Sequence, residues 1–369
     1  MSTQDDSKAI PLAFVHEQVP VRLLELPPSL LSLIENSTSQ SSAPVLKIKA
    51  PPKPTDNGST TASTGPAPFA VLTTATETYN IRSVHSSNSI FILKPVPIPI
   101  LPDQDDVDSD TEMADDPIIT SKPGMIVTST CASHLELLPS KPNTELLLQS
   151  ALTEYKSFET PPGRPSEPLS KSQILLNTPV SDAEFHEGWR DVTAFEIDNW
   201  ALRLSPPTAL KIFEVLISLI LSRRQVEEID KNEMGMYFFN KLVEEDGDLE
   251  YPSDAIRAVV RGAFEGKKTE DGSIAYSYDT PYTTKWVGKH ILLSNPNKSY
   301  TEREFMEAWR SKAPDECEKF VDLKLLEGLH TRSVLGVIRY IHSTDNEGGV
   351  APAKKKNKWH EKFAAGKKR

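Results

Sequence analysis

The stretch that decides the fold is WVGKHILLSNPNKSYTEREFMEAWRSKAPDECEKFVDLKLLEGLHTRSVLGVIRYI, residues 286–341. It opens with apolar side chains at helical spacing and closes with β-branched and aromatic residues, as strands do. In between, Thr301 and Glu304 form a capping box, which satisfies free N–H groups at the start of a second helix. A third helix is expected over roughly Glu316–Leu326, before a strand at Val334–Ile341. Three helices followed by a strand is the element order of a winged helix, a module that binds DNA or protein.

The segment before this stretch contains a second winged-helix candidate. Ser181 and Glu184 form another capping box, and a strand is expected at Asn199–Leu204. The next helix starts at Ser205, which caps it, has prolines in its first turn, and runs to about Arg224. Because this helix is apolar nearly all round, we expect it to be buried between two modules. Further helices are expected at Ile174–Leu176, Met234–Glu245 and Ser253–Phe264, and a strand at Ile274–Tyr278.

The N-terminal part of the chain is richer in short strands. The candidates, all rich in Val, Ile, Thr or aromatic residues, are Val45–Lys49, Phe69–Thr74, Tyr79–Val84 and Ser89–Leu93. They are too few and too short to close a barrel alone, so open edges remain that can accept a strand from another chain. Pro-rich and acidic segments at about 51–68 and 95–123 lack the apolar content that offsets chain entropy, and we expect them to be disordered.

These patterns predict an α+β fold in four parts. A β-rich region, 1–140, forms a barrel only with the help of partner chains. Two winged-helix regions follow, at 141–230 and 231–345, and a disordered basic tail occupies 346–369.

The charge of the chain is polarised along its length. The formal net charge is −11 over 369 residues, which disfavours a protein that coats nucleic acid with its whole surface. Residues 103–116 contain eight acids and no base, whereas residues 354–369 contain eight bases against Glu361 alone. The basic cluster indicates a nuclear-import signal or a non-specific phosphate contact, so we expect a nuclear protein.

Several classes of protein are disfavoured by composition. The two cysteines, Cys131 and Cys317, permit neither a disulfide framework nor a zinc site with Cys ligands, and they fit a reducing compartment. The longest apolar run, Ile212–Leu221, contains Glu214 and has about half the length that a membrane span needs. No signal peptide is recognisable at the N-terminus. We therefore expect a soluble, intracellular protein without a membrane partner.

No residue pattern indicates catalysis. Gly262–Thr269 resembles a phosphate-binding loop, but its glycine spacing is one residue short and Lys268 stands where Ser or Thr should hold magnesium. The eight histidines show no pair at i, i+4 spacing and no nearby cysteine, as zinc sites would require. No nucleophile elbow and no dinucleotide fingerprint is present. We expect a non-enzymatic protein without catalytic residues, cofactor or metal.

The candidate contacts with DNA or protein are cations around the second winged helix and in the tail. The first group, which could meet phosphates or a protein partner, comprises Lys285, Lys289, Lys298, Arg303, Arg310 and Lys312. The second group, for nucleic acid or nuclear import, comprises Lys354, Lys355, Lys356, Lys358, Lys367, Lys368 and Arg369. The alternative for the first group is that these cations lie on solvent-exposed helix faces and contact no partner. Four of the five tryptophans, Trp189, Trp200, Trp286 and Trp309, are expected in the core, and Trp359 in the tail.

With these residues laid out, the chain resembles the Dcc family of sister chromatid cohesion proteins. The likeness rests on three blocks in the family's order: LLEL at 23–26 with the strands of 70–93; LEL at 135–137 with the block from Ile174 to Trp200; and ILL at 291–293, FMEAW at 305–309 and DLKLLEGL at 322–329. Together the blocks cover about two-thirds of the chain. The family usually has a third winged helix after the second, whereas only a basic tail follows here.

The resemblance implies a non-catalytic subunit of an alternative replication factor C clamp loader, which supports sliding-clamp loading, DNA replication and sister chromatid cohesion. The N-terminal strands would fold together with the small and large cohesion-specific loader subunits. The winged helices would dock on DNA polymerase epsilon and touch DNA weakly and without sequence preference, and the sliding clamp would be an indirect partner.

The alternative is a stand-alone winged-helix transcription or chromatin factor. Such a protein needs a basic recognition helix, whereas Pro314–Leu326 carries four acids against two lysines. Protein docking is therefore favoured over DNA reading for this segment.

Overall fold

The computed structural model describes residues 10–38, 43–50, 70–99, 121–157, 160–226, 234–245, 250–333 and 336–341. The chain divides into two compact units. Unit 1 comprises Met1–Ile48, Phe69–Thr74 and Thr78–Ser140, and unit 2 comprises Lys49–Pro68, Ala75–Glu77 and Lys141–Arg369.

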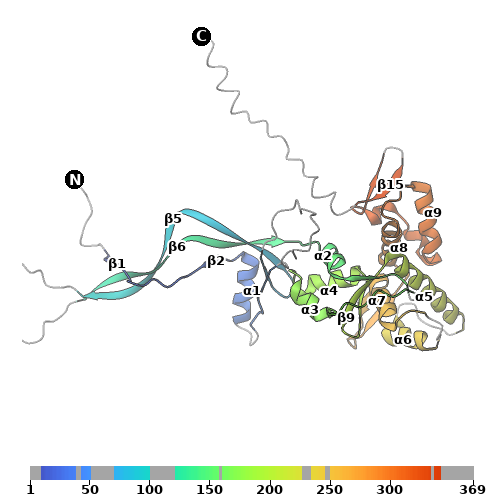
Figure 1. The fold of residues 1–369 in the computed structure, drawn as a ribbon, viewed down its shortest axis with the longest axis horizontal. Helices are drawn as coiled ribbons and strands as arrows, with labels where there is room; N and C mark the ends of the chain where they lie inside the picture. Colours follow the sequence, from blue (N-terminus) through green and yellow to red (C-terminus); the bar gives the residue numbers. More distant parts are fainter. Residues whose placement is uncertain are drawn as a thin grey trace, which may run out of the picture. The chain divides into compact units, whose positions relative to one another are not determined.

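Unit 1 is built on one six-stranded sheet of order β1-β6-β5-β4-β3, in which β2 also pairs with β6. Its elements are β1 (Leu12–Phe14), β2 (Leu23–Glu25), α1 (Pro28–Thr38), β3 (Lys47–Lys49), β4 (Val71–Thr73), β5 (Thr78–Pro99) and β6 (Ser121–Ser140). The two long strands β5 and β6 pair antiparallel as a ribbon, visible in Figure 1, and β1 and β2 lie parallel to β6. The described strands form an open sheet and not a closed barrel.

Strand β5 is longer than the sequence predicts. The candidates Tyr79–Val84 and Ser89–Leu93 are parts of this one strand, because the irregularity between His85 and Ile90 shifts the pairing register without ending the strand. The disorder expected over 95–123 is wrong at both ends, since β5 continues to Pro99 and β6 starts at Ser121. Residues 51–68 and 100–120 lie outside the described residues.

The prolines of β5 lie on its open edge. Met125, which pairs with Pro95, donates its N–H away from β5, to Pro11 O at 2.9 Å. The Pro95 nitrogen therefore faces away from β6, and the alternating Pro97 and Pro99 face the same way. A strand tolerates proline at such edge positions, because no ladder hydrogen bond is lost there. This geometry explains how a proline-rich segment can be a strand.

Unit 1 has a small core of its own. Its buried cluster consists of Leu30, Leu72, Tyr79 and Leu137, where α1 lies against the sheet. The Tyr79 hydroxyl pairs with the Ser29 hydroxyl at 3.0 Å. Because this cluster is small, unit 1 has few contacts between buried apolar side chains to stabilise its fold.

Unit 2 repeats one order of elements three times: a helix, a short strand, two or three helical segments, and two strands. The first repeat contains α2 (Thr144–Ala151), β7 (Thr153–Tyr155), α3 (Lys171–Asn177), α4 (Asp182–Asp191), β8 (Ala194–Ile197) and β9 (Trp200–Leu204). The second contains α5 (Pro206–Val226), β10 (Met234–Gly235), α6 (Met236–Glu245), α7 (Ser253–Ala263), β11 (Glu265–Lys268) and β12 (Ile274–Ser277). The third contains α8 (Pro281–Ser294), β13 (Tyr300–Thr301), α9 (Glu302–Lys312), η3 (Asp315–Phe320), η4 (Leu323–Leu326), β14 (His330–Arg332) and β15 (Val337–Tyr340).

The sheets of the three repeats have the same strand order. In each, the third strand along the chain is central, giving β7-β9-β8, β10-β12-β11 and β13-β15-β14. The first repeat differs in one respect, because β7 runs parallel to β9 whereas the corresponding pairs in the other two are antiparallel. The sequence analysis predicted two winged-helix regions and placed the residues of α5 at the end of the first. In the structure α5 precedes β10 and begins the second repeat.

Local sequence signals specify several helix starts and one turn. Both predicted capping boxes are present: Glu184 N–H donates to Ser181 Oγ and Glu304 N–H to Thr301 Oγ1, each at 3.3 Å. Strand β8, which the sequence analysis missed, joins β9 through Asp198-Asn199, both with positive φ. Two such residues between paired strands form the hairpin turn whose twist matches the strands.

The predicted helix at Glu316–Leu326 is wrong in kind. The segment forms two short 3₁₀ helices, η3 and η4. Asp322 separates them, because its carboxylate accepts the N–H of Lys324 at 2.9 Å and starts a new cap. The expected last strand is β15, which covers Val337–Tyr340, and Val334 and Leu335 lie outside the described residues.

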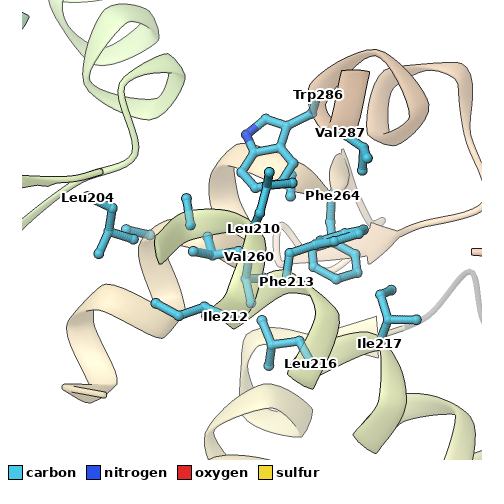
Figure 2. Close-up of a cluster of buried hydrophobic side chains, with 14 of the residues drawn as sticks. Leu204, Leu210, Ile212, Phe213, Leu216, Ile217, Val260, Phe264, Trp286 and Val287 are labelled. Carbon is cyan, nitrogen blue, oxygen red and sulfur yellow. The ribbon is translucent and has the colours of Figure 1, made fainter. Parts of the chain in front are cut away.

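Helix α5 lies at the centre of the main core, as its apolar sequence predicted. Phe213 is fully buried, with its ring centroid 5.8 Å from that of Phe264 on the α7 side and 5.3 Å from that of Trp286 on α8 (Figure 2). One continuous cluster runs from Tyr155 to Ile338, so elements of all three repeats share it. The four tryptophans predicted as core are buried: Trp189, Trp200, Trp286 and Trp309.

His290 is a neutral histidine inside this core. Its side chain stacks on Trp286, with ring centroids 3.7 Å apart, and its Nδ1 lies 2.9 Å from Trp286 O. Because a carbonyl oxygen only accepts hydrogen bonds, Nδ1 carries the proton and donates it. Burial, reinforced by the charge of Lys289, lowers the pKa of His290 from 6.5 to about 3.

The buried imidazole should make the protein less stable in acid. Between the two pKa values the unfolded chain binds a proton that the folded chain does not, so the free energy of unfolding falls as the pH drops below 6.5. We expect a loss of about 2 kcal/mol between neutral pH and about pH 5. Urea unfolding at several pH values should show a shallower dependence for His290→Asn than for the natural chain. His330→Asn, which changes a similar Nδ1 contact at a half-buried ring, should keep the natural dependence, and equal slopes in all three proteins would contradict the assignment.

Gly288 allows α8 to approach Trp309 closely. A Cβ at this position would lie 2.6 Å from two atoms of the Trp309 ring, and that ring is fixed by an indole N–H bond to Thr284 O at 2.9 Å. Gly288→Ala should therefore destabilise the fold by about 1–3 kcal/mol, because the buried indole has no room to move. Thermal unfolding measures the effect. Gly163→Ala, whose Cβ would meet nothing within 4 Å, is the control, and an equal shift in melting temperature for both variants would disprove the steric explanation.

Candidate functional site

Four of the six cations predicted to contact DNA or protein are held in ion pairs within the molecule. These pairs are Lys289 Nζ–Glu145 Oε2 at 2.7 Å, Arg303 Nε–Glu307 Oε1 at 2.8 Å, Arg310 Nε–Glu318 Oε1 at 3.9 Å, and Lys312 with Glu214. Lys289 and Lys312 connect different repeats, whereas Arg303 pairs within α9. A DNA phosphate would have to share these four cations with their carboxylate partners or displace the carboxylates.

The other two candidates are exposed but lie in different surroundings. Lys298 lies over the Tyr300 ring, 4.4 Å from its centroid. Lys285, on α8, lines a pocket of about 400 Å³ in which Lys285, Arg190 and Lys289 are balanced by Glu187, Asp191 and Glu327. The structure thus does not gather the six cations into one basic surface. The predicted tail contacts, Lys354, Lys355, Lys356, Lys358, Lys367, Lys368 and Arg369, lie outside the described residues, as does Trp359.

The surface around η3 is acidic. Asp279, Asp315, Glu316 and Glu318 line one depression together with Lys319. Glu316 also accepts the Tyr278 hydroxyl at 3.2 Å and pairs with Arg224 at 3.6 Å, which joins η3 to the end of α5. Burial, and next the charge of Glu316, raises the pKa of Tyr278 to about 12. The surface of η3 therefore presents mainly carboxylates.

A cationic pocket, which the sequence analysis missed, lies where the three repeats meet. Lys171 starts α3, Arg190 ends α4, and Arg261 lies in the last turn of α7. All three line a cavity of about 580 Å³ that also contains the apolar side chains of Trp189, Ala194, Ala258, Phe264, Ile274, Tyr276 and Tyr282, with His186, Glu265 and Gly266. These cations are far apart in sequence and form no run of charge, so no sequence signal could have indicated them.

The cations of the pocket influence one another. The pKa of Lys171 is lowered first by burial and next by the charge of Arg261, while Glu196 opposes both effects. The pKa of His186 is lowered by burial and by the charge of Lys171. Arg190 and Arg261 act in the same direction on Tyr276, whose pKa burial nonetheless raises. The pocket is thus a locally positive site on an acidic chain.

Unit 1 exposes apolar side chains along the edges of its sheet. On β1, Leu12 and Phe14 are 53% and 58% exposed, and on β3, Ile48 is 72% exposed. Beyond Ile81, the outer edge of β5 has no neighbouring strand among the described residues. A sheet with a long unpaired edge and exposed apolar residues is suited to pairing with another chain.

The described residues contain no group of three or more His, Cys, Asp or Glu side chains placed to hold a metal ion. No helix in the described part of the chain combines the length and apolar character that crossing a membrane requires.

The comparisons with known proteins identify the family. The family described as sister chromatid cohesion protein Dcc1 matches residues 21–345, which include most of both units. A search among curated proteins returned no match. A match over most of the chain implies a role in sister chromatid cohesion and a partner complex related to cohesion. The chain belongs to the Dcc1 family of sister chromatid cohesion proteins.

Proposed function

We propose that the chain is a non-catalytic subunit of an alternative replication factor C complex in the nucleus. In this complex it supports sliding-clamp loading, DNA replication and sister chromatid cohesion by connecting the loader to DNA polymerase epsilon and to DNA. The catalytic step of clamp loading belongs to other subunits in this proposal. The proposal rests on the family match and on the sequence resemblance, which covers the same two units.

The observation that carries the proposal is the open sheet of unit 1. Its own buried cluster contains four side chains, while apolar residues of β1 and β3 are exposed at its edges. Partner strands could pair with the outer edge of β5 and cover these side chains, which would turn the open sheet into part of a shared barrel. The large and small cohesion-specific loader subunits are the proposed partners.

The three repeats of unit 2 support a docking role. We infer that they are winged helices, because each has a helix, a strand, two or three helical segments and a two-stranded wing in the order of that module. In the last two repeats, the segment at the place of a winged helix's recognition helix is better suited to contact protein than DNA. Most of α7 is buried, and η3 is lined by acids. DNA contact is therefore expected to be weak and non-specific, with polymerase docking as the main role.

The proposed assembly can be tested with the edges of unit 1. We expect Leu12→Asp combined with Ile48→Asp to prevent co-purification with the two loader subunits, because each charge would be buried in the shared sheet. The chain alone should fold as before, since both side chains are more than half exposed. Co-expression of the three full chains, followed by size-exclusion chromatography with mass measurement, gives the stoichiometry.

The matched control for this experiment is Leu176→Asp combined with Tyr237→Asp in unit 2, where the side chains are 65% and 81% exposed. This variant should assemble normally. Assembly of the unit 1 variant, or equal loss in the control, would refute the role given to the sheet.

The weak DNA contact is tested with Lys285 and Lys298. Lys285→Glu combined with Lys298→Glu should reduce duplex affinity about fivefold and lower the salt dependence by about one to two counterions, because phosphate contacts release bound cations. Fluorescence anisotropy at several salt concentrations measures both quantities. Lys267→Glu combined with Lys268→Glu, exposed on β11, controls for net charge. An equal reduction in the control would show that overall charge, and not these positions, governs binding.

A further inference from the structure

The cationic pocket of unit 2 combines two chemistries that a ligand must match. Its positive side is formed by Lys171, Arg261 and Arg190, and Arg190 also pairs with Asp191 at 3.7 Å. Glu265 is the one acid among the described lining residues. Its apolar side includes Ile274, which is 44% exposed, and Tyr282, over whose ring Arg190 lies at 5.9 Å. A matching ligand therefore carries negative charge beside an apolar or aromatic group.

The cations are positioned by the fold rather than by flexible loops. Lys171 follows the capping box of Ser170 and Gln173, and its own N–H donates to Glu196 at 2.8 Å. Its Nζ lies 5.0 Å from the centroid of the buried Trp189 ring. A cation held over an aromatic face has less freedom to lose when a ligand arrives, which favours binding.

The shape and surroundings of the pocket favour a peptide over nucleic acid. A duplex binds along several phosphates on an extended basic surface, whereas these three cations lie within one cavity of about 580 Å³. In the adjoining pocket, which shares Arg190 and Tyr282, the cations are balanced by Glu187, Asp191 and Glu327, so the positive surface does not continue there for a polyanion to follow. A peptide can place a few carboxylates on the cations and avoid these acids.

We propose that this pocket binds an acidic segment of a partner protein, in which two or more carboxylates flank an aromatic or large aliphatic side chain. The carboxylates pair with Lys171, Arg190 and Arg261, and the apolar side chain rests against Ile274 and Tyr282. Binding draws on all three repeats at once, because the lining comes from α3 and α4, from α7 and the β11–β12 hairpin, and from the start of α8. The inference goes beyond the proposed function, since it requires neither loader subunits nor DNA.

The test uses the full chain and a fluorescent peptide with four repeats of Asp-Glu-Phe. Its neutral counterpart, four repeats of Asn-Gln-Phe, has nearly the same shape without the charges. Fluorescence anisotropy should show binding of the acidic peptide and at least tenfold weaker binding of the neutral one. Lys171→Gln combined with Arg261→Gln should weaken binding of the acidic peptide at least about tenfold, because two charged contacts are lost.

The matched control is Lys267→Gln combined with Lys268→Gln, which removes the same charge from β11 outside the lining of the pocket. It should keep the natural affinity within about twofold, and circular dichroism should show that both variants are folded. Equal loss in the two variants, or no binding of the acidic peptide by the natural chain, overturns the proposal. A twelve-residue oligo-dT that binds more tightly than the peptide, and loses affinity in the pocket variant alone, also overturns it and assigns the pocket to nucleic acid.

Discussion

The burial of α5 is the constraint on which unit 2 depends. A helix that is apolar on nearly every side cannot lie on a surface, so elements from more than one repeat have to cover it. Phe213 of α5 is covered in this way, with the Phe264 ring on one side and the Trp286 ring on another. The continuous core that results holds the repeats as one body, and the cationic pocket exists because that body fixes α4, α7 and the start of α8 side by side.

Unit 1, by contrast, is built on strand pairing rather than on a large packed core. Its long strands satisfy each other's backbone groups along the β5–β6 ribbon, yet most of the apolar area that would usually form a core stays near the surface. Hydrogen bonding alone contributes little net stability, because water competes for the same groups. The two units therefore differ in how their apolar side chains are placed. Unit 2 packs them into a continuous core, whereas unit 1 leaves many of them exposed.

Sequence reasoning succeeded where a local rule decides the structure. Capping boxes marked helix starts, and apolar periodicity identified α5 and the buried tryptophans. It failed where a single side chain competes for a backbone N–H, and where residues distant in sequence meet in the fold. The break at Asp322 depends on one side chain competing for a backbone N–H, and the third repeat was hidden because α5 belongs by packing to the elements after it. The six candidate cations were chosen for their charge and for their place around the second predicted winged helix. Glu145 and Glu214, which are remote in sequence, pair with two of them. Lys171, Arg190 and Arg261 meet only in three dimensions.

The alternating prolines of β5 have a consequence for a subunit made before its partners are present. Unpaired strand edges are the usual starting point for stacking of identical chains into fibrils. Pro95, Pro97 and Pro99 remove every N–H from one stretch of the open edge, so a second copy of the ribbon finds no donors there. Pairing of another strand with β5 is therefore directed toward the segment between Arg82 and Leu93, which lies nearer the buried cluster of unit 1. The prolines that predicted disorder for the last part of β5 therefore make its open edge a poor template for stacking of identical chains.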